Sequence, residues 1–504
     1  MKNIKTAAVI FSIVAFQAGC AIFIQKYPSD IPGEDKNIIV NSYEDAWLEK
    51  DSYPYDRQLI HLGLPSPKSV VLWYVLDKKD LHRMVQPHIE VCVQGIDHQE
   101  CVYEKYDNIQ YVHLSEYGTG RIEILGLKPD QFYRGRVKLL GEAVEFTAST
   151  APEPEDQKPF SFIVYSGFQP YAWKSRDQSP HVYRQTVRIL DMLKERAKPT
   201  IDSKENDKSR PAFILGIGDQ VYVDNDAHKY KPTALLWGKH SDRIRCSDEY
   251  LGECFDEVYR RHFAIPTLDE TFRYLPSIMI WDDHEIRDGW GSQGDEKEKD
   301  KITGGYKWAN YLNAARGAFI AYQALRNPGL GEFVDQAPGE YFWDSINQGA
   351  QTRERIKKEV IYTEDPTTGK ELFFSFDWGS ASFFVMDLRS YRYAEENRVI
   401  SSNQFKAIEA WLKRMESIAT PSPKLLVLVS TMPLLAGRAK GSEFFAELFK
   451  SELADDLIDK WDSTENDDQR QKLLCLFARF IEKNKTTHRV LMITGDIHAS
   501  EVVY

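Results

Sequence analysis

The stretch that decides the fold is Ser277-Ile278-Met279-Ile280-Trp281-Asp282-Asp283-His284-Glu285. Its first half is a short apolar run, which is typical of a strand that other layers cover on both faces. Its second half changes abruptly to carboxylates and an imidazole. In open α/β sheets, ligands bind outside the carboxyl ends of the strands. The stretch therefore predicts a buried strand with a polar site at its end.

Two further segments repeat this pattern. Ile214-Leu215-Gly216-Ile217 runs into Gly218-Asp219-Gln220-Val221-Tyr222, and Leu491-Met492-Ile493-Thr494 runs into Gly495-Asp496-Ile497-His498. A single Asp after a strand is commonly a turn former. Three such segments, each with Asp plus His or Tyr, instead indicate a shared site. Carboxylate and phenolate oxygens and imidazole nitrogens suit hard and borderline metal ions, so we expect a site for more than one ion.

Strands alternate with helices throughout residues 160–504, which is typical of a layered α/β domain. The expected strands are 160–165, 212–217, 277–281, 382–386, 425–429 and 490–494, and the expected helices are 182–198, 308–325 and 402–417. We therefore take residues 160–504 as the domain that carries the site.

A different pattern precedes this domain. Residues 59–150 contain short segments rich in β-branched and aromatic residues, which predict a small all-β domain. Leu127-Lys128-Pro129 followed by Tyr133 resembles the corner of a fibronectin-type or immunoglobulin-like sandwich, where a Tyr hydroxyl ties one strand back to the chain. Residues 151–159 are rich in Pro and acidic residues and are expected to form a linker.

The N-terminus has the layout of a secretory signal. Lys2 and Lys5 precede an apolar run at 7–16, and Gln17-Ala18-Gly19-Cys20 follows. Ala-Gly-Cys resembles a bacterial lipoprotein box, which predicts a signal peptide at 1–19, a lipid on Cys20 and an N-terminal extension at 20–58. An uncleaved anchor is the alternative, since the apolar stretch continues beyond Cys20. Both readings predict an exported protein, periplasmic or at the cell surface, and in the lipoprotein reading Cys20 holds it to the membrane.

Length and charge limit the partners. The chain has 504 residues, which is long for one hydrophobic core. Its formal net charge is −12, and Lys and Arg do not occur in blocks. A general polyanion binder needs a basic surface, so no nucleic acid is expected as a partner. Small anionic substrates stay open, because bound metal ions reverse the field in one cleft.

Six cysteines are compatible with an oxidising compartment. Cys92 with Cys101, and Cys246 with Cys254, are close enough in sequence to form disulfides, although spacing alone does not establish a pair. Cys475 lies in an apolar helical stretch and is interpreted as a buried thiol.

These motifs together resemble the alkaline phosphatase D (PhoD-like) family of the calcineurin-like metallophosphoesterases. The resemblance covers the small β domain, Gly-Asp-x-x-Tyr at 218–222, Trp-Asp-Asp-His-Glu at 281–285, Phe-Val-Met-Asp-Leu-Arg-Ser-Tyr-Arg at 384–392 and Gly-Asp-Ile-His at 495–498. It implies a metallophosphoesterase-type β-sandwich flanked by helices over residues 160–504.

The resemblance also implies a set of metal ligands. Two or more ions are expected, Fe³⁺ and Ca²⁺ in this family, with other divalent ions left open. Asp219 would bridge two ions, and Tyr222 would bind the iron as a phenolate together with His498. Asp283 and Asp496 would hold the other ion.

Catalytic roles follow from the same resemblance. His284, beside Asp283, would lie next to the phosphate and protonate the leaving oxygen or stabilise charge. Arg389 would contact the phosphate, with a salt bridge to Asp387 as an equal alternative. The implied activity is that of a phosphodiesterase or alkaline phosphomonoesterase in which a metal-activated hydroxide attacks phosphorus. A small phosphate ester, a lipid head group or a polymer would be the substrate.

Two departures from the family pattern favour other readings. Gly167 stands where the family commonly has a Cys that supplies a thiolate to the iron, and the chain ends at Tyr504, where relatives continue. A C-terminal truncation is therefore expected. The main alternative function is a catalytically weak or inactive surface lipoprotein that binds phosphorylated ligands. A metal-dependent hydrolase of non-phosphate esters is the third reading.

Overall fold

The structure is a computed structural model of the chain. It describes residues 12–13, 56–81, 83, 85–92, 102–168, 192–197, 210–224, 251–291, 308–328, 371–392, 398–417, 424–434, 461 and 466–496.

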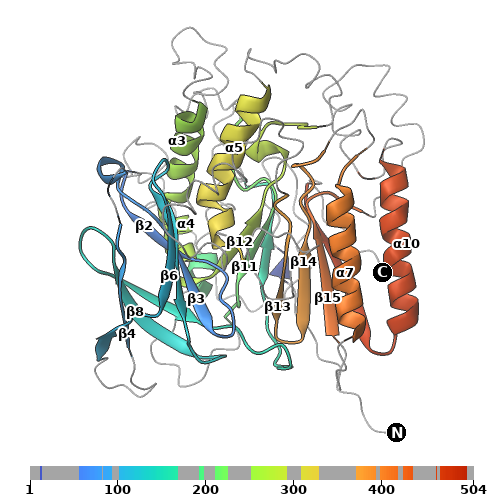
Figure 1. Ribbon diagram of the computed structural model, residues 1–504, viewed down its shortest axis with the longest axis horizontal. Coiled ribbons are helices and arrows are strands. Elements are labelled where there is room, and N and C mark those ends of the chain that lie inside the picture. Colours follow the sequence, from blue (N-terminus) through green and yellow to red (C-terminus); the bar gives the residue numbers. More distant parts are fainter. Residues whose placement is uncertain are drawn as a thin grey trace, which may run out of the picture.

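Two sheets form the centre of the molecule (Figure 1). The first has the order β1-β10-β11-β12 and is parallel throughout; its strands are β1 (Ser12–Ile13), β10 (Ile163–Tyr165), β11 (Ile214–Ile217) and β12 (Ser277–Ile280). The second has the order β13-β14-β15-β16, with β13 antiparallel to β14; its strands are β13 (Phe374–Trp378), β14 (Ala381–Val385), β15 (Lys424–Ser430) and β16 (His488–Thr494).

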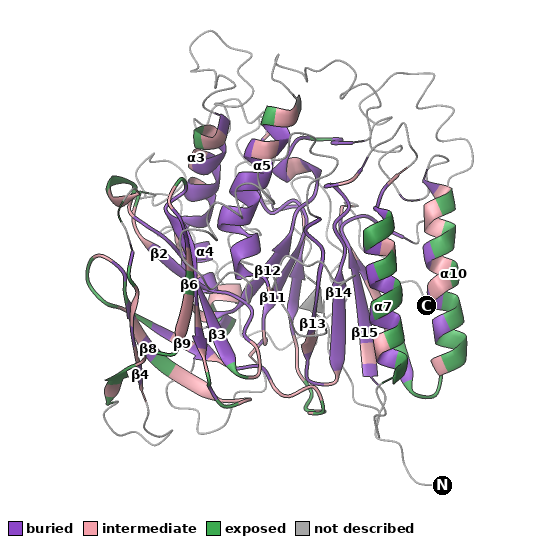
Figure 2. Ribbon diagram, in the orientation of Figure 1, coloured by how far each residue is buried: buried purple, intermediate pink, exposed green. Residues whose placement is uncertain are grey.

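Helices cover the outer faces of both sheets. They are α3 (Leu251–Phe263), α4 (Pro266–Tyr274), α5 (Trp308–Tyr322), α7 (Ser402–Ser417) and α10 (Asp467–Asn484). In Figure 1, α3 and α5 lie beside the first sheet, and α7 and α10 lie beside the second. Figure 2 shows buried strands throughout the centre, with the exposed faces of α7 and α10 turned outward.

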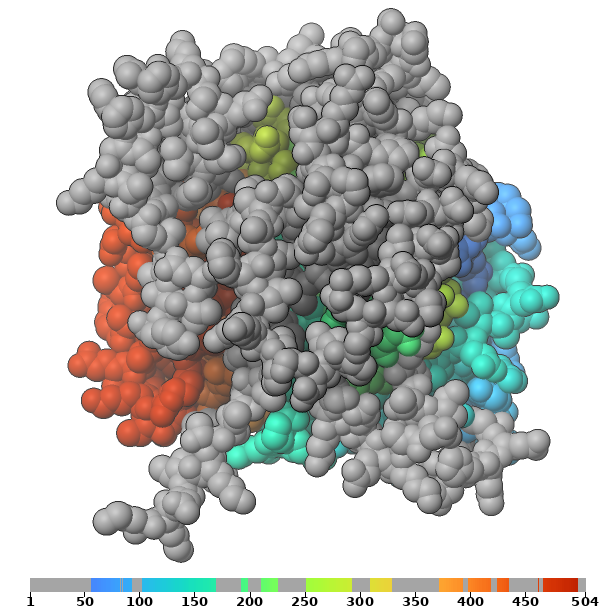
Figure 3. Space-filling view, turned by 180° about the vertical axis from the view of Figure 1, so that it is seen from behind, coloured from blue at the N-terminus to red at the C-terminus, as the bar shows by residue number. Residues whose placement is uncertain are grey.

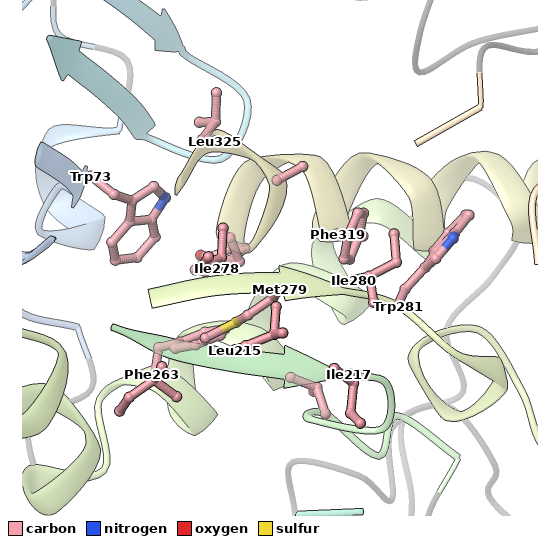
Figure 4. Close-up of a cluster of buried hydrophobic side chains, with 14 of the residues drawn as sticks. Trp73, Leu215, Ile217, Phe263, Ile278, Met279, Ile280, Trp281, Phe319 and Leu325 are labelled. Atoms are coloured by element: carbon pink, nitrogen blue, oxygen red, sulfur yellow. The ribbon is translucent and has the colours of Figure 1, made fainter. Parts of the chain in front are cut away.

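Side-chain alternation along the second sheet creates two cores. Val385 and Val427 belong to a large core that also contains the first sheet, α3 and α5. Phe384 and Leu426, one position away, belong to a core with α7 and α10. Successive side chains of a strand point to opposite faces, so the second sheet is buried on both. Figure 4 shows the other side of the large core, where Phe319 of α5 lies next to Ile280 of β12.

The N-terminal part of the described chain forms two antiparallel sheets. Their orders are β2-β3-β7-β6 and β5-β4-β8-β9. The strands are β2 (Leu59–Leu62), β3 (Ser69–Val75), β4 (His88–Cys92), β5 (Tyr103–Lys105), β6 (Ile109–Leu114), β7 (Thr119–Leu125), β8 (Phe132–Lys138) and β9 (Val144–Ser149). The main-chain N–H of Lys128 donates to Tyr133 Oη (2.8 Å), as expected for a tyrosine corner. Figure 3 shows these sheets and α10 at opposite ends of the molecule.

This β region shares a core with the α/β part. Leu59, Trp73 and Val75 belong to the same hydrophobic cluster as the first sheet. A separate fibronectin- or immunoglobulin-like domain with a boundary near residue 150 therefore stays a prediction, since no break in the core marks the boundary.

A buried arginine fastens the two parts together. Arg326 follows α5 and is fully buried, with its Cζ 4.1 Å from the ring centroid of Trp73. Its Nη2 donates to His61 Nδ1 (2.9 Å), and His61 Nε2 donates to Asp269 Oδ1 (3.0 Å). Its Nη1 donates to Ser277 Oγ at the start of β12 (3.0 Å). Burial lowers the pKa of Arg326 to about 9. Aromatic rings and hydrogen-bond partners from both parts of the fold stabilise its charge.

Most expected strands are present with shifted ends, but several elements were not predicted. The helices α3 and α4 and the strand β13 were not expected, and of the helix expected at 182–198 only 192–197 is described. The interpretation of Cys475 as a buried thiol is wrong. Cys475 is exposed, because it lies on the face of α10 opposite to Leu473 and Phe477.

The expected signal peptide and Cys20 lie outside the described residues, of which only the backbone of β1 falls in this segment. None of the described helices is both long and apolar enough to cross a bilayer. Cys92 and Cys254 are each disulfide-bonded, and their partner cysteines fall outside the described residues.

Acid is expected to destabilise the fold through His262 of α3. Burial, and then the charge of Arg326, lowers the pKa of His262 from 6.5 to about 3. As the pH falls below 6.5, the unfolded chain takes up a proton at this residue while the folded chain does not. The stabilising contribution is therefore complete above that pH and decreases as the pH falls, by about 2 kcal/mol at about pH 5.

The variant His262→Phe tests this contribution by urea unfolding at about pH 8 and about pH 5. Phenylalanine keeps the edge contacts of the ring with Phe168 and Phe263 but does not titrate. We expect the loss of unfolding free energy between the two pH values to be smaller in the variant by about 2 kcal/mol. An identical loss in both proteins would contradict the assignment.

Candidate metal centre

The first site loop leaves β11 through a strained turn. Gly218 has φ 93°, and an added Cβ would lie 2.6 Å from the Cβ of Asp282, so no side chain fits there. Asp219 follows with φ 57° and is buried. A non-glycine residue with positive φ is uncommon, although Asp tolerates it, and such strain is frequent at functional sites. The turn aims the Asp219 carboxylate at the end of β12.

The second and third site loops meet the first. Asp282 follows β12, and Asp283 and His284 lie in the 3-10 turn Asp283–Glu285. Asp283 Oδ2 accepts the main-chain N–H of Gly289 (2.7 Å). After β16, Asp496 has φ 65°, and its main-chain N–H points to Ser166 Oγ (3.4 Å). Ends of strands from both sheets therefore converge.

Two groups of potential ligands result, and Asp219 belongs to both. One consists of Asp219, Asp283 and His284, and the other of Asp219, Asp282 and Asp496. Within each group the ligand atoms lie within 4.8 Å of one another. A shared Asp219 has the position that a bridging ligand requires. The sequence analysis gave Asp282 no role, because nothing in the sequence distinguishes it from Asp283 as a candidate ligand.

The electrostatics of the groups fit metal ions. Burial raises the pKa of Asp219 well above its usual range, and the charge of Asp283 raises it further. Buried like charges are costly unless a cation compensates them. Carboxylates and an imidazole are the donors that hard and borderline cations prefer. These residues therefore fit a metal centre, while the identity of the ions stays a prediction.

Tyr222 and His284 lie against each other beside this centre. Their ring centroids are 4.1 Å apart with an interplanar angle of 30°. Burial raises the pKa of Tyr222 well above its usual value, and the charges of Asp219 and Asp283 add to the rise. Tyr222 is thus a neutral phenol in this environment unless a cation stabilises the phenolate.

A carboxylate that the sequence analysis missed holds His284. The Nδ1 of His284 donates to Asp224, at 2.9 and 3.0 Å from its two oxygens. Burial lowers the pKa of His284, but the charges of Asp224, Asp283 and Asp219 outweigh it and raise the pKa well above its usual value. The His284 side chain is 22% exposed. Position 224 follows the Tyr222 motif by two residues, and only the fold brings it to the imidazole.

Arg389 lies behind the ligands and is fully buried. Its Nε donates to Asp282 Oδ1, and its Nη2 lies 3.5 Å from Asp283 Oδ1. Asp387, the expected partner in the alternative reading, accepts the main-chain N–H of Arg389 (3.1 Å) and the indole N–H of Trp281 (2.9 Å). The guanidinium thus supports two ligand carboxylates, and a phosphate contact of Arg389 stays a prediction.

Glu285 was part of a quoted motif but received no role. It is fully buried, and its oxygens accept main-chain N–H groups from both the first and the second site loop. Burial raises the pKa of Glu285 to about 7, and the main-chain donors oppose the rise.

Two expected positions remain. His498 lies outside the described residues. Gly167 adopts φ 65° beside the first site loop, and its main-chain N–H points to the carbonyl oxygen of Gly218 (3.4 Å). The position that carries the family thiolate is thus next to the centre but supplies no side chain.

Comparison with known proteins identifies the family. Residues 202–504, more than half of the chain, match the family model described as PhoD-like phosphatase. The chain belongs to the PhoD-like phosphatase family. This confirms the resemblance that the sequence motifs predicted.

Two proteins that are similar to the chain differ from it in length and sequence. An uncharacterized protein of Saccharomyces cerevisiae is 23% identical over 333 residues, which cover 57% of this chain and 44% of that protein. The chain thus spans less than half of the length of this relative. The solved structure of PhoD is 16% identical, covers 89% of this chain and 73% of its own, and superposes with a TM-score of 0.52. This likeness confirms the mixed α/β fold.

Replacing the shared ligand is expected to separate metal binding from stability. Asparagine tolerates the positive φ of position 219 as aspartate does, so Asp219→Asn removes the charge and keeps the turn. We expect the variant to lose bound metal, measured by mass spectrometry after dialysis. We also expect it to melt at a higher temperature than the wild type in chelator, because a buried carboxylate repelled by Asp283 is gone.

Asp377→Asn is the matched control, since Asp377 pairs with Arg414 (3.0 Å) and belongs to neither ligand group. It should keep the wild-type metal content. Wild-type metal content in Asp219→Asn would remove Asp219 from the centre.

Proposed function

We propose that the protein is a metal-dependent phosphoesterase that hydrolyses phosphate monoesters, diesters or both. The observation that carries the proposal is the pair of ligand groups that share Asp219, one of which includes His284, a partly exposed imidazole paired with Asp224. Membership in the PhoD-like phosphatase family supports a hydrolase of this class.

Asp219, Asp282, Asp283 and Asp496, with Tyr222 and His498 as the further predicted ligands, would hold the ions. When bound, metal ions lower the pKa of a coordinated water and neutralise charge on phosphoryl oxygens. Fe³⁺ and Ca²⁺ are the ions expected from the family. Gly167 supplies no thiolate, so the donor set is rich in oxygen and favours hard ions, which include Ca²⁺ and Mn²⁺ as well as Fe³⁺.

The chain's own groups take the remaining roles. Nδ1 of His284 is held by Asp224, which leaves Nε2 to carry a proton toward the leaving oxygen. The raised pKa of His284 keeps that proton on the ring. Arg389 is buried against Asp282 and Asp283, so we assign it to fixing these carboxylates, and its predicted contact with the phosphate would come in addition.

The location and substrate belong to the same proposal. Disulfide bonds at Cys92 and Cys254 support an oxidising compartment, which agrees with export and a lipid anchor at Cys20. A small phosphate ester, a lipid head group or a polymer is the proposed substrate. The β region at 59–150 is proposed to be a fibronectin-like unit that supports the α/β part through Arg326.

Hydrolysis assays test the activity directly. The full chain, loaded with Mn²⁺ or Ca²⁺, is given bis-p-nitrophenyl phosphate and p-nitrophenyl phosphate in parallel, with and without chelator. We expect turnover that disappears in chelator and in Asp219→Asn, and the ratio of the two rates assigns the diester or monoester class. A folded, metal-loaded protein with no turnover above Asp219→Asn would leave the ligand-binding lipoprotein as the better account.

Loss of the carboxylate behind His284 should slow catalysis without removing metal. In Asp224→Asn the imidazole loses the charge that keeps its proton, so we expect kcat to fall by about 10²-fold, with KM and metal content unchanged. Asp288→Asn is the control. The side chain of Asp288 is exposed, and its contact with Asp224 is made by the main-chain N–H, which the substitution does not change. A wild-type kcat in Asp224→Asn would show that His284 is not the proton donor.

A further inference from the structure

The carboxylate of Glu285 is shared by two of the loops that carry the candidate ligands. Its Oε1 accepts the main-chain N–H groups of Gln220 (2.7 Å) and Val221 (3.0 Å) in the first site loop. Its Oε2 accepts those of Asp219 (3.0 Å), in the same loop, and Asp282 (2.9 Å), in the second. One buried side chain thus receives four main-chain donors.

We propose that Glu285 is the positioning residue of the metal centre, which sets Asp219 against Asp282 and Asp283 before any ion binds. Glu285 acts through the two loops and is not itself a ligand. The inference rests on the proposed metal site but is independent of the phosphoesterase activity.

The shape of the first site loop makes an anion necessary. Positive φ angles at Gly218 and Asp219 turn the three successive N–H groups of residues 219–221 toward one point. Successive N–H groups that converge in this way form a concave site for anions. Here the anion is the side chain of Glu285. Without it, three buried main-chain donors would lose their acceptor, which is costly for each of them.

The acceptor must be a carboxylate of glutamate length. An ionised carboxylate has two oxygens that each accept more than one hydrogen bond, whereas a glutamine amide has one such oxygen and an NH₂ group that would face two donors. Aspartate keeps the charge but is one methylene shorter, so its oxygens cannot reach both loops. Gln323, which follows α5, donates to Oε1 from the other side (3.4 Å), and this contact ties the carboxylate to the helical layer.

The same contacts explain how ligand positions in two loops are coupled. Asp219 and Asp282 belong to one candidate ligand group, and the N–H groups of both residues bind the same oxygen of Glu285. If one loop shifts and carries the Glu285 carboxylate with it, the hydrogen bond between Glu285 and the other loop lengthens. Residues behind metal ligands commonly raise metal affinity by fixing the geometry of the ligands.

Metal affinity is the measurement that tests the proposal. Mn²⁺ is titrated by calorimetry into metal-free wild type, Glu285→Gln and Glu285→Asp, with the fold checked by circular dichroism. Removal of groups behind metal ligands typically costs about 10- to 100-fold in affinity, and we expect both variants to lose at least about tenfold. Glu285→Asp separates the effect of side-chain length from that of charge. If charge alone mattered, this variant would keep the wild-type affinity for Mn²⁺.

Asp269→Asn is the matched control. Asp269 is a buried carboxylate that accepts from His61, Arg57 and Arg273 and contacts neither site loop. It is expected to lower the melting temperature of the metal-free protein while keeping wild-type Mn²⁺ affinity. Wild-type affinity in a folded Glu285→Gln, or an equal loss of affinity in Asp269→Asn, would overturn the proposal.

A measurement on the wild type needs no variant to fold. If Glu285 organises the loops before metal binds, the N–H groups of Gln220, Val221 and Asp282 should exchange slowly with deuterium in the chelated protein. Exchange at these positions as fast as in an unfolded chain, with protection appearing only after Mn²⁺ is added, would show that the ion builds the loops and would overturn the proposal.

Discussion

The crowding of carboxylates at the ends of β11, β12 and β16, of which Asp219 and Asp282 are buried and Asp496 is half-buried, is the constraint on which the rest of the structure depends. Asp219, Asp282 and Asp496 come from two sheets, and their oxygens lie within 4.8 Å of one another. The backbones must therefore approach closely. Glycine permits this approach at Gly218 and Gly495, where an added Cβ would lie 2.6 Å from Asp282 Cβ and from Ile217 O, respectively. The two sheets meet most tightly where their charges are concentrated.

The strand β12 shows how the fold separates stability from chemistry. At its start, Ser277 Oγ accepts from the buried Arg326 and lies 3.2 Å from the carbonyl oxygen of Leu62, so the N-terminal sheets are fastened there. At its end, the chain turns into Asp282 and Asp283. The start of the strand lies against the buried cation of Arg326, which aromatic rings and polar groups surround. The end of the strand leads into the buried carboxylates of Asp282 and Asp283, which need cations to compensate them. The contacts of Arg326 hold the start of the strand, and the candidate ligands follow its other end.

The sequence predicted what local patterns encode. Apolar runs that end in Asp located β11, β12 and β16, because a strand covered on both faces leaves an almost continuous apolar record. The same logic failed for Asp224, Asp282 and Glu285, whose roles arise from contacts between loops that are distant in sequence. It also failed for β13, where Ser375 and Asp377 interrupt the apolar run, and for Cys475, because α10 buries only one face. Most candidate ligands directly follow an apolar run and were visible in the sequence, whereas Asp224 and Glu285, which hold neighbouring residues in place, were not.

Two supports of opposite charge hold the candidate ligands in place. Arg389 compensates Asp282 and Asp283 directly, which reduces the repulsion that the ligands exert on one another. Glu285 adds a further negative charge, but four main-chain donors stabilise it. These donors offset part of the cost of burying the Glu285 carboxylate, and their hydrogen bonds order the loops. Asp219 has a main-chain N–H that is fixed by Glu285 and a carboxylate that no cation of Arg389 reaches among the described ion pairs. Its position is therefore set before an ion binds, and the charge of His284 offsets part of the repulsion that Asp283 exerts on its carboxylate.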